Sequence, residues 1–287
     1  MKKYLFLFFL IAVCSSCGDD DNKKVMEPVL NKLTKVTSTK NGEPFFTADV
    51  TYTREGKLDR ILTDQYTDLF TYTGNTLVVA GTKNNSASSA LFTHTIYTLS
   101  GNTIVQKTER AENPYASNEV YDSSISTYRY AGAYLSVVSQ MVRWPKVNGG
   151  GYEERNLGEV DKFVWERGNV AYYDYIPRQE MAYEYGNHLR PSNFPFRVIS
   201  TFRPVGFEIV SPVNSMFGGL NLNLPERAYW YNISSEMVIC AEYAYTYTFT
   251  GDYISSMTIT EKINPVNDAK EEENTYKYTF EYNYKVK

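Results

Sequence analysis

Hydrophobic and polar residues alternate along most of the chain with a period of two, which is the pattern of β-strands that bury one face. The clearest example is residues 70–79, FTYTGNTLVV, in which aromatic residues alternate with threonines up to a central Gly-Asn pair. A glycine with positive φ at the first of two turn residues suits a type II′ hairpin turn. The segment therefore predicts a tight hairpin in which Phe70 pairs with Val79 and Tyr72 pairs with Leu77. All the large apolar side chains then share one face.

The same hairpin unit recurs along the chain, with Gly-Asn, Gly-Ala, Arg-Gly or Gly-Asp at the turn. A three-residue loop with glycine at its left-handed position gives a further unit. Cross-strand pairs of aromatic and aliphatic side chains stabilise a sheet by roughly 0.2–1 kcal/mol each. The pairs predicted in this way are Tyr52–Leu58, Leu99–Ile104, Tyr128–Val137, Tyr130–Leu135, Trp165–Val170 and Phe249–Ile254.

These repeats predict an all-β fold, an antiparallel meander of hairpins with little helix, because no stretch shows a helical apolar period over eleven residues. We assign residues 33–287 to a single domain. Residues 186–230 interrupt the pattern with five prolines, which disfavour regular central strands. We expect an irregular insertion there. It is either a loop that pads and caps the apolar core, which we favour, or a functional loop or plug at an open end.

The N-terminus has the features of a secretory signal. Two lysines precede a ten-residue apolar run at residues 4–13, which is too short to span a bilayer. Small residues then lead into cysteine, in a pattern that resembles a bacterial lipobox. We predict a signal peptide at residues 1–16, lipidation at Cys17 with Cys14 as the alternative, and an acidic tether at residues 17–32.

The three aspartates at residues 19–21 resemble the acidic cluster that follows the lipidated cysteine in surface lipoproteins of the Bacteroidetes. The formal net charge is −4, and removal of Lys2 and Lys3 makes it about −6. We therefore expect membrane attachment through the acyl chains and not through a basic patch. The balance of charges also excludes a nucleic-acid partner, which requires a clustered basic face.

A family resemblance rests on three features. They are the repeated aromatic-x-aromatic-x-Gly-Asn-x-aliphatic unit, its variant FVWERGNV at residues 163–170, and the segment FGGLNLNLP at residues 217–225. Together they resemble Bacteroidetes surface lipoproteins that form a domain of unknown function with a porin-like β fold. The resemblance covers about residues 30–287. It implies a meander curled into a barrel or half-barrel, located at the outer membrane and exposed on the cell surface, and it supplies no catalytic residues.

Candidate chemistry is sparse, and we predict no catalytic residue, metal site or cofactor. His94 and His188 are far apart and lack metal-ligand spacing, and we expect His94 to be packed in the core. If Cys17 is acylated and Cys14 is removed, Cys240 is the remaining thiol, and its apolar surroundings favour a buried hydrophobic role. The acidic runs at 153–154 and 271–273 are typical of solvated loops.

The sequence therefore supports a lipid-anchored binding or accessory protein for glycan or another nutrient, with a glycan or an outer-membrane protein as candidate partner. Trp144, Trp165 and Trp230 are candidates for stacking on a sugar, although a core position is the more common role of tryptophan. The alternatives are a hydrolase acting on an extracellular polymer, a structural envelope protein and a transmembrane barrel. Short strands with Thr, Ser, Arg and Glu on their second face disfavour the last of these.

Overall fold

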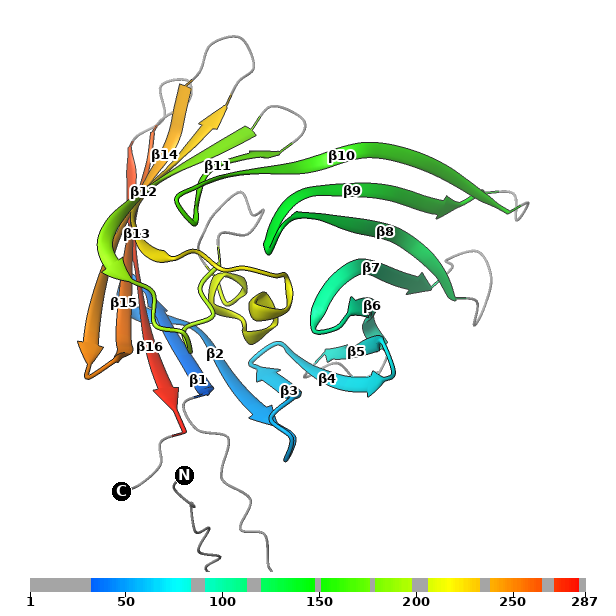
Figure 1. The fold of residues 1–287 in the computed structure, drawn as a ribbon, viewed down its shortest axis with the longest axis horizontal. Helices are drawn as coiled ribbons and strands as arrows, with labels where there is room; N and C mark the ends of the chain where they lie inside the picture. The colour runs from blue at the N-terminus through cyan, green and yellow to red at the C-terminus, as the bar shows by residue number, and fades with distance from the viewer. Residues whose placement is uncertain are drawn as a thin grey trace, which may run out of the picture.

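The described strands form one closed barrel. The structure is a computed structural model that describes residues 32–83, 91–112, 120–147, 151–175, 179–197, 206–232, 238–264 and 271–283. Sixteen antiparallel strands follow one another around the wall in chain order, and the first pairs with the last (Figure 1). The predicted all-β meander is confirmed, and the open choice between a barrel and a half-barrel is decided in favour of a closed barrel.

Among the described residues, regular structure outside these strands is limited to two short 3-10 helices, η1 (Glu208–Val210) and η2 (Pro212–Met216). Within the described ranges, no helix has the length and apolar character needed to cross a membrane. The strands are β1 Leu33–Lys40, β2 Glu43–Tyr52, β3 Leu58–Thr63, β4 Tyr66–Thr73, β5 Thr76–Lys83, β6 Leu91–Ser100, β7 Thr103–Glu112, β8 Val120–Ala131, β9 Tyr134–Pro145, β10 Tyr152–Glu166, β11 Asn169–Tyr175, β12 Gln179–Leu189, β13 Asn223–Asn232, β14 Val238–Thr250, β15 Tyr253–Ile263 and β16 Glu272–Tyr282.

The predicted hairpin registers are confirmed with one exception. The confirmed pairs are Phe70–Val79, Tyr72–Leu77, Tyr52–Leu58, Leu99–Ile104, Tyr130–Leu135, Trp165–Val170 and Phe249–Ile254.

The exception is Tyr128, which pairs with Val138 and not with Val137. A β-bulge at Ser136 adds one residue to β9, and the Ser136 hydroxyl donates a hydrogen bond to the Arg129 carbonyl oxygen at 2.9 Å. One extra residue reverses which side chains face inward. The bulge therefore buries Val138, which is 5% exposed, in the barrel interior.

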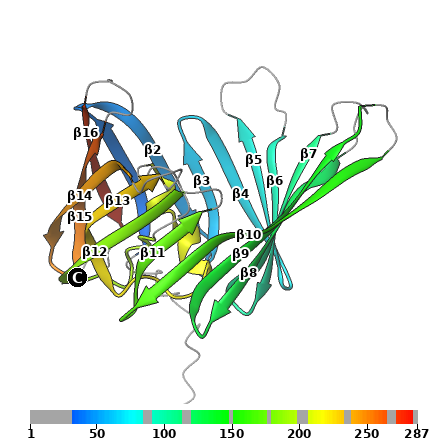
Figure 2. The same ribbon diagram turned by 90° about the horizontal axis from the view of Figure 1, so that it is seen from above.

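The two ends of the barrel differ in their connections. Because the strands alternate in direction, the short turns at 53–57, 74–75, 101–102, 132–133, 167–168 and 251–252 all lie at one end, which we call the turn rim. The start of β1 and the end of β16 lie there as well. The connections between β5 and β6, β7 and β8, β9 and β10, β11 and β12, β13 and β14, and β15 and β16 lie at the other end, the loop rim. Toward the loop rim, strands β7 to β10 diverge from the rest of the wall (Figure 2).

The segment between β12 and β13 folds into the barrel from the turn rim, and we call its described residues, 190–197 and 206–222, the plug (Figure 1). It is shorter than the insertion expected at 186–230, because both flanking strands extend into that range. Its last residues are tied to two turns of the rim: the Gly219 amide donates to Ala133 O at 2.6 Å, and the Leu222 amide donates to Gly168 O at 2.9 Å.

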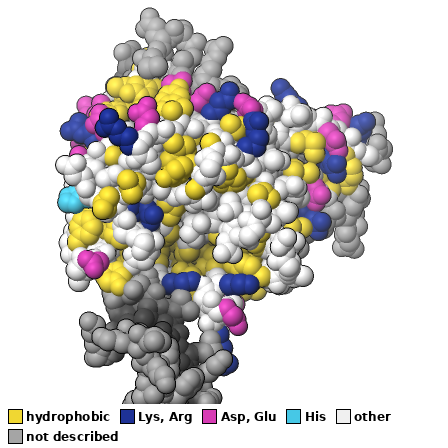
Figure 3. Space-filling model, viewed as in Figure 1, with side chains coloured by type: hydrophobic (Ala, Val, Ile, Leu, Met, Phe, Trp, Pro, Cys, Tyr) yellow, Lys and Arg dark blue, Asp and Glu magenta, His cyan; other side chains and the backbone are white. Residues whose placement is uncertain are grey.

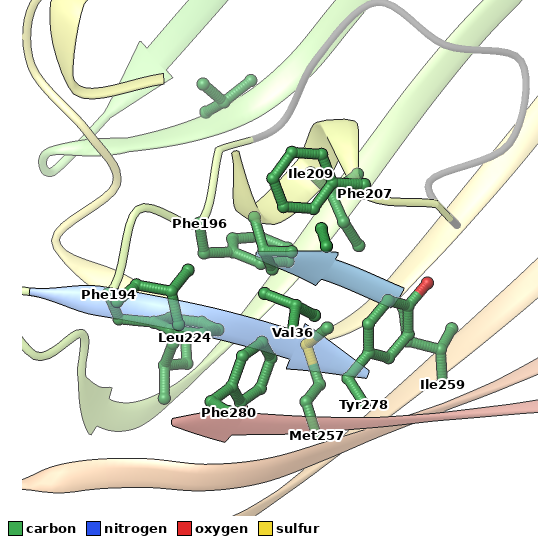
Figure 4. Close-up of a cluster of buried hydrophobic side chains, with 14 of the residues drawn as sticks. Val36, Phe194, Phe196, Phe207, Ile209, Leu224, Met257, Ile259, Tyr278 and Phe280 are labelled. Atoms are coloured by element: carbon green, nitrogen blue, oxygen red, sulfur yellow. The ribbon is translucent and has the colours of Figure 1, made fainter. Parts of the chain in front are cut away.

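The plug fills one half of the interior with apolar side chains. Phe194 and Phe196 are almost fully buried, and Phe194 meets Phe280 of β16 edge to face with ring centroids 5.1 Å apart. Figure 4 shows these rings packed against residues of β1, β15 and β16. We call this region, formed by β1, β2, β14–β16 and the facing plug residues, the packed half. The region enclosed by β6–β10 is the cavity half.

The outer face of strands β14–β16 is mainly polar. In β16 the exposed Lys277, Thr279 and Glu281 alternate with buried aromatic residues. This is the reverse of the outward apolar band that a transmembrane barrel presents to lipid. On the face shown in Figure 3, most charged side chains lie toward the margin and both signs of charge occur together.

Candidate functional site

The cavity half encloses a space of about 370 Å³ between strands β6–β10 and the plug. This volume is within the range of small-molecule sites, which combine aromatic walls with a few polar groups. Both kinds of group are present. Its lining includes the aromatic residues Tyr97, Tyr128, Phe163 and Phe217, the charged residues Lys107, Asp161 and Arg197, and the polar residues Ser126, Gln140 and Asn214.

An aromatic cluster forms the part of the cavity wall where the plug meets β6 and β8. Phe217 of the plug lies edge to face against Tyr128 and Tyr97, with ring centroids 5.1 and 6.3 Å away. Burial raises the pKa of both tyrosines, and the nearby carboxylates of Glu109 and Asp161 raise that of Tyr128 further. Both hydroxyl groups are therefore neutral at physiological pH and can donate a hydrogen bond to a ligand.

Arg197 brings a buried positive charge to the cavity. Only 5% of the residue is exposed, and burial lowers the pKa of its guanidinium to about 10. Nη1 donates to Phe217 O at 2.8 Å and to Asn214 O at 3.4 Å, and the guanidinium lies 5.1 Å from the centre of the Phe217 ring. Nη2 has no hydrogen-bond partner within the described part of the chain. The charge is thus held in place by plug carbonyls without an acidic partner among the described residues.

Asp161 of β10 supplies a buried carboxylate at the same cavity. It is 7% exposed, and the Tyr173 hydroxyl donates a hydrogen bond to Oδ1 at 2.5 Å. Burial raises the pKa of Asp161 to about 6 in spite of this bond. The side chain therefore changes charge close to neutral pH.

Lys107 and Glu109 of β7 form an ion pair of 2.6 Å at the cavity edge nearer the loop rim. Their side chains are 27% and 42% exposed, so solvent reaches the cavity from this side. Partial burial acts to raise the pKa of Glu109, but Lys107 and the Ser124 hydroxyl, which donates to Glu109 at 2.6 Å, hold it below its usual value.

The three tryptophans proposed for sugar stacking lie outside this cavity. Trp144, at the loop-rim end of β9, is 39% exposed, and its indole donates to Glu153 Oε2 at 3.0 Å. Trp165 is half-buried, donates to Leu135 O at 2.6 Å and packs on Tyr134 with ring centroids 4.5 Å apart. Trp230 is half-buried against the core. Of the three, Trp144 exposes the most surface.

The remaining candidates from the sequence are placed as follows. Cys240 is buried, as predicted, and burial raises the pKa of its thiol. His188 is exposed beside the Phe249 ring, whereas the side chain of His94 lies outside the described residues, as do Cys14 and Cys17. Glu154 pairs with Arg143 across β9 and β10. Within the described ranges, no group of three His, Cys, Asp or Glu side chains could hold a metal ion.

The cavity residues could not be identified from the sequence, because they come from five strands and from a segment without periodicity. Arg197 follows the plug aromatics in the run NFPFR at residues 193–197, and nothing local shows that it faces into a barrel. Alternation from the buried Ile104 would place Lys107 and Glu109 on the outer face of β7. They face inward because a bulge adds Val105 to the strand.

Comparisons with known proteins agree with this fold. No curated protein matches the chain. A crystal structure of a porin-like protein from Bacteroides uniformis ATCC 8492 superposes with a TM-score of 0.55 at 14% identity, covering 87% of this chain and 96% of the other. A porin-like protein from Bacteroides vulgatus ATCC 8482 gives 0.55 at 15% identity, covering 88% and 98%. At these identities the likeness concerns the fold alone. A family model described as a domain of unknown function, DUF5032, matches residues 18–287, and the chain therefore belongs to this family.

Proposed function

We propose that the protein is a lipid-anchored binding protein of the outer cell surface that takes up a small glycan fragment or a similar polar nutrient inside its barrel. The observation that carries this proposal is the cavity of about 370 Å³ between the plug and β6–β10. Aromatic rings such as Phe217 and Phe163 offer apolar faces to a sugar ring, and the neutral tyrosine hydroxyls with Gln140 and Ser126 offer hydrogen bonds. This combination is typical of sites that bind small polar molecules.

The point at which the tether joins the barrel supports an orientation in which the turn rim faces the membrane. If Cys17 carries the acyl chains, the tether of residues 17–32 joins the barrel at the turn rim, where β1 begins. Sixteen residues span at most about 55 Å when extended. The turn rim then faces the membrane, and the more exposed Lys107–Glu109 side of the cavity points toward the loop rim and the medium. A nutrient arriving from outside would meet the open side of the cavity.

The test is calorimetric titration of the full-length protein in detergent with a panel of neutral and acidic mono- and disaccharides. Ser126 is 7% exposed and lines the cavity, so Ser126→Phe places a ring in the binding space. Trp144→Ala removes the exposed tryptophan and serves as the matched control. We expect at least one sugar to bind, Ser126→Phe to abolish the binding, and Trp144→Ala to leave it unchanged.

Absence of binding across the panel would overturn the proposal. Binding that Trp144→Ala removes and Ser126→Phe retains would move the site to the outer edge of β9. Thermal unfolding of both variants checks that they are folded. Release of shorter products during titration would instead favour the alternative, a hydrolase.

A further inference from the structure

We propose that Arg197 is an anion-binding group and that the ligand of the cavity carries an oxyanion, a carboxylate or a sulfate. This inference rests on the proposed function, because it specifies the ligand class of the same cavity. It follows from the position, the fixation and the missing partner of one side chain.

No acidic side chain among the described residues pairs with Arg197. An ionised group that is removed from water is strongly destabilised unless it is paired and hydrogen-bonded. Arg197 is 5% exposed, and its Nη2 lacks a partner among the described residues. Residues 198–205, which follow it in the chain, have the sequence VISTFRPV and contain no acidic side chain. The protein therefore keeps a buried cation in a side chain that lines the cavity, and the Nη2 of this side chain has no partner among the described residues.

The guanidinium is held ready for a ligand. Nη1 is fixed by the carbonyl oxygens of Phe217 and Asn214, and the guanidinium carbon lies over the Phe217 ring, 5.1 Å from its centre. Asn214 is itself fixed, because its Nδ2 donates to Pro195 O at 3.0 Å and to Glu208 O at 2.8 Å. A guanidinium that is ordered before binding loses little entropy on binding, and its planar donors match carboxylate and sulfate oxygens.

Among the charged groups at the cavity, Arg197 is the one available to bind an anion. Lys107 is already paired with Glu109 at 2.6 Å. Asp161 is the one carboxylate that lines the cavity in the described ranges, and Tyr97 and Tyr128 are neutral donors. An oxyanion of the ligand would be bound by Arg197 and by a tyrosine hydroxyl, while the aromatic walls contact the ring that carries it.

The test compares a neutral sugar with its acidic counterpart. Calorimetric titration of the full-length protein in detergent is carried out with glucose and glucuronate, and with N-acetylglucosamine and its 6-sulfate. We expect at least one acidic member to bind tenfold or more tightly than its neutral counterpart. We expect Arg197→Met to reduce that affinity to the neutral level and Arg197→Lys to retain part of it. Lys277→Met, on the exposed outer face of β16, is the matched control and should preserve the preference.

The outcomes separate the two proposals. If sugars bind without preference for the acidic members, the anion inference is overturned and the proposed function stands. If no sugar of either class binds, the proposed function is overturned together with it. If a further variant, Lys107→Met, removes the preference while Arg197→Met retains it, the anion site belongs to Lys107. Because the comparison of neutral and acidic sugars uses the unaltered protein, it remains decisive even if Arg197→Met does not fold.

Discussion

The two halves of the barrel are built from the same hairpin unit but have opposite interiors. In the packed half, the aromatic side chains of the plug meet the inward residues of the wall in a cluster of buried apolar side chains (Figure 4). In the cavity half, the plug reaches the wall at Phe217, and a space of about 370 Å³ remains beyond it. The same strand repeat therefore surrounds a packed core on one side and a cavity on the other. The position of the plug determines which part of the interior is filled.

Two buried carboxylates, one in each half, differ in the number of hydrogen bonds that they accept. Glu261, in the packed half, is fully buried and accepts hydrogen bonds from Tyr243 Oη at 3.2 Å, Asn274 Nδ2 at 3.2 Å and Tyr276 Oη at 3.1 Å. Three donors thus satisfy the hydrogen-bonding capacity of this buried carboxyl group.

Asp161, in the cavity half, receives one such bond, from Tyr173, and its pKa is raised to about 6 by burial. Nη2 of Arg197 also lacks a partner among the described residues, but so do the hydroxyl groups of Ser38 and Tyr245 in the packed half. The difference between the halves therefore concerns the buried charges and not every polar group.

The largest expected effect comes from truncating the plug in each half. Phe194→Ala removes a ring with no exposed surface and should lower the free energy of unfolding by about 3–5 kcal/mol. Phe217→Ala enlarges an existing cavity beside a half-buried ring, so its effect should be about half as large. Denaturant titration of both variants measures the difference. Equal losses would mean that the cavity half is packed as tightly as the other half.

Exchanging each carboxylate for its amide should change stability in opposite directions. Glu261→Gln places an amide against three donors and should lower the free energy of unfolding by about 2–3 kcal/mol. Asp161→Asn removes a charge whose burial is unfavourable and should raise it by about 1–3 kcal/mol at pH 7.

The gain from Asp161→Asn should depend on pH. The pKa of Asp161 rises on folding from 3.8 to about 6. Its contribution to stability is therefore fully present below pH 3.8 and is lost as the pH rises through about 6. Thermal unfolding of wild type and variant between pH 4 and pH 7 should show the advantage of the variant at pH 7 and little difference at pH 4. A constant advantage would show that charge is not its cause.

The smallest expected difference concerns the attachment of the plug to the turn rim. Gly218 has a φ of +83°, and a Cβ atom there would lie 2.5 Å from Ala133 O, whereas Gly74, with a φ of +57°, has no atom within 4 Å of such a Cβ. Alanine is strained at both positions by the backbone conformation. Only Gly218→Ala adds a clash, so we expect it to lose about 1–3 kcal/mol more than Gly74→Ala. Denaturant titration tests this, and equal losses would contradict a tight contact between plug and rim.

Local pairing was predictable because each hairpin is encoded within about ten residues. Alternation and a glycine turn were enough to place Phe70 opposite Val79, and the same held for most other units. The one wrong pair, Tyr128 with Val137, shows the limit. Val137 and Val138 are both apolar, so hydrophobic pattern cannot choose between them, and the choice depends on the bulge at Ser136.

The cavity residues could not be predicted in this way. Arg197 lies in a segment with five prolines nearby and no period, so its neighbours depend on how the plug folds. The tryptophans were candidates because their residue type suits stacking on a sugar, but their positions in the fold were not predictable. Trp165, for example, donates a hydrogen bond to the Leu135 carbonyl oxygen and packs as part of the wall.

The amino-acid order determined the class of fold, the hairpin turns and the inward face of most strands, since these depend on contacts between residues close in sequence. The tertiary structure alone decided that the meander closes, because Val36 must meet Phe280 at the far end of the chain after the twist of every intervening strand has accumulated. It also decided the location of the plug. A segment without its own hydrophobic face takes the space that the wall leaves, and that space exists only once the barrel is closed.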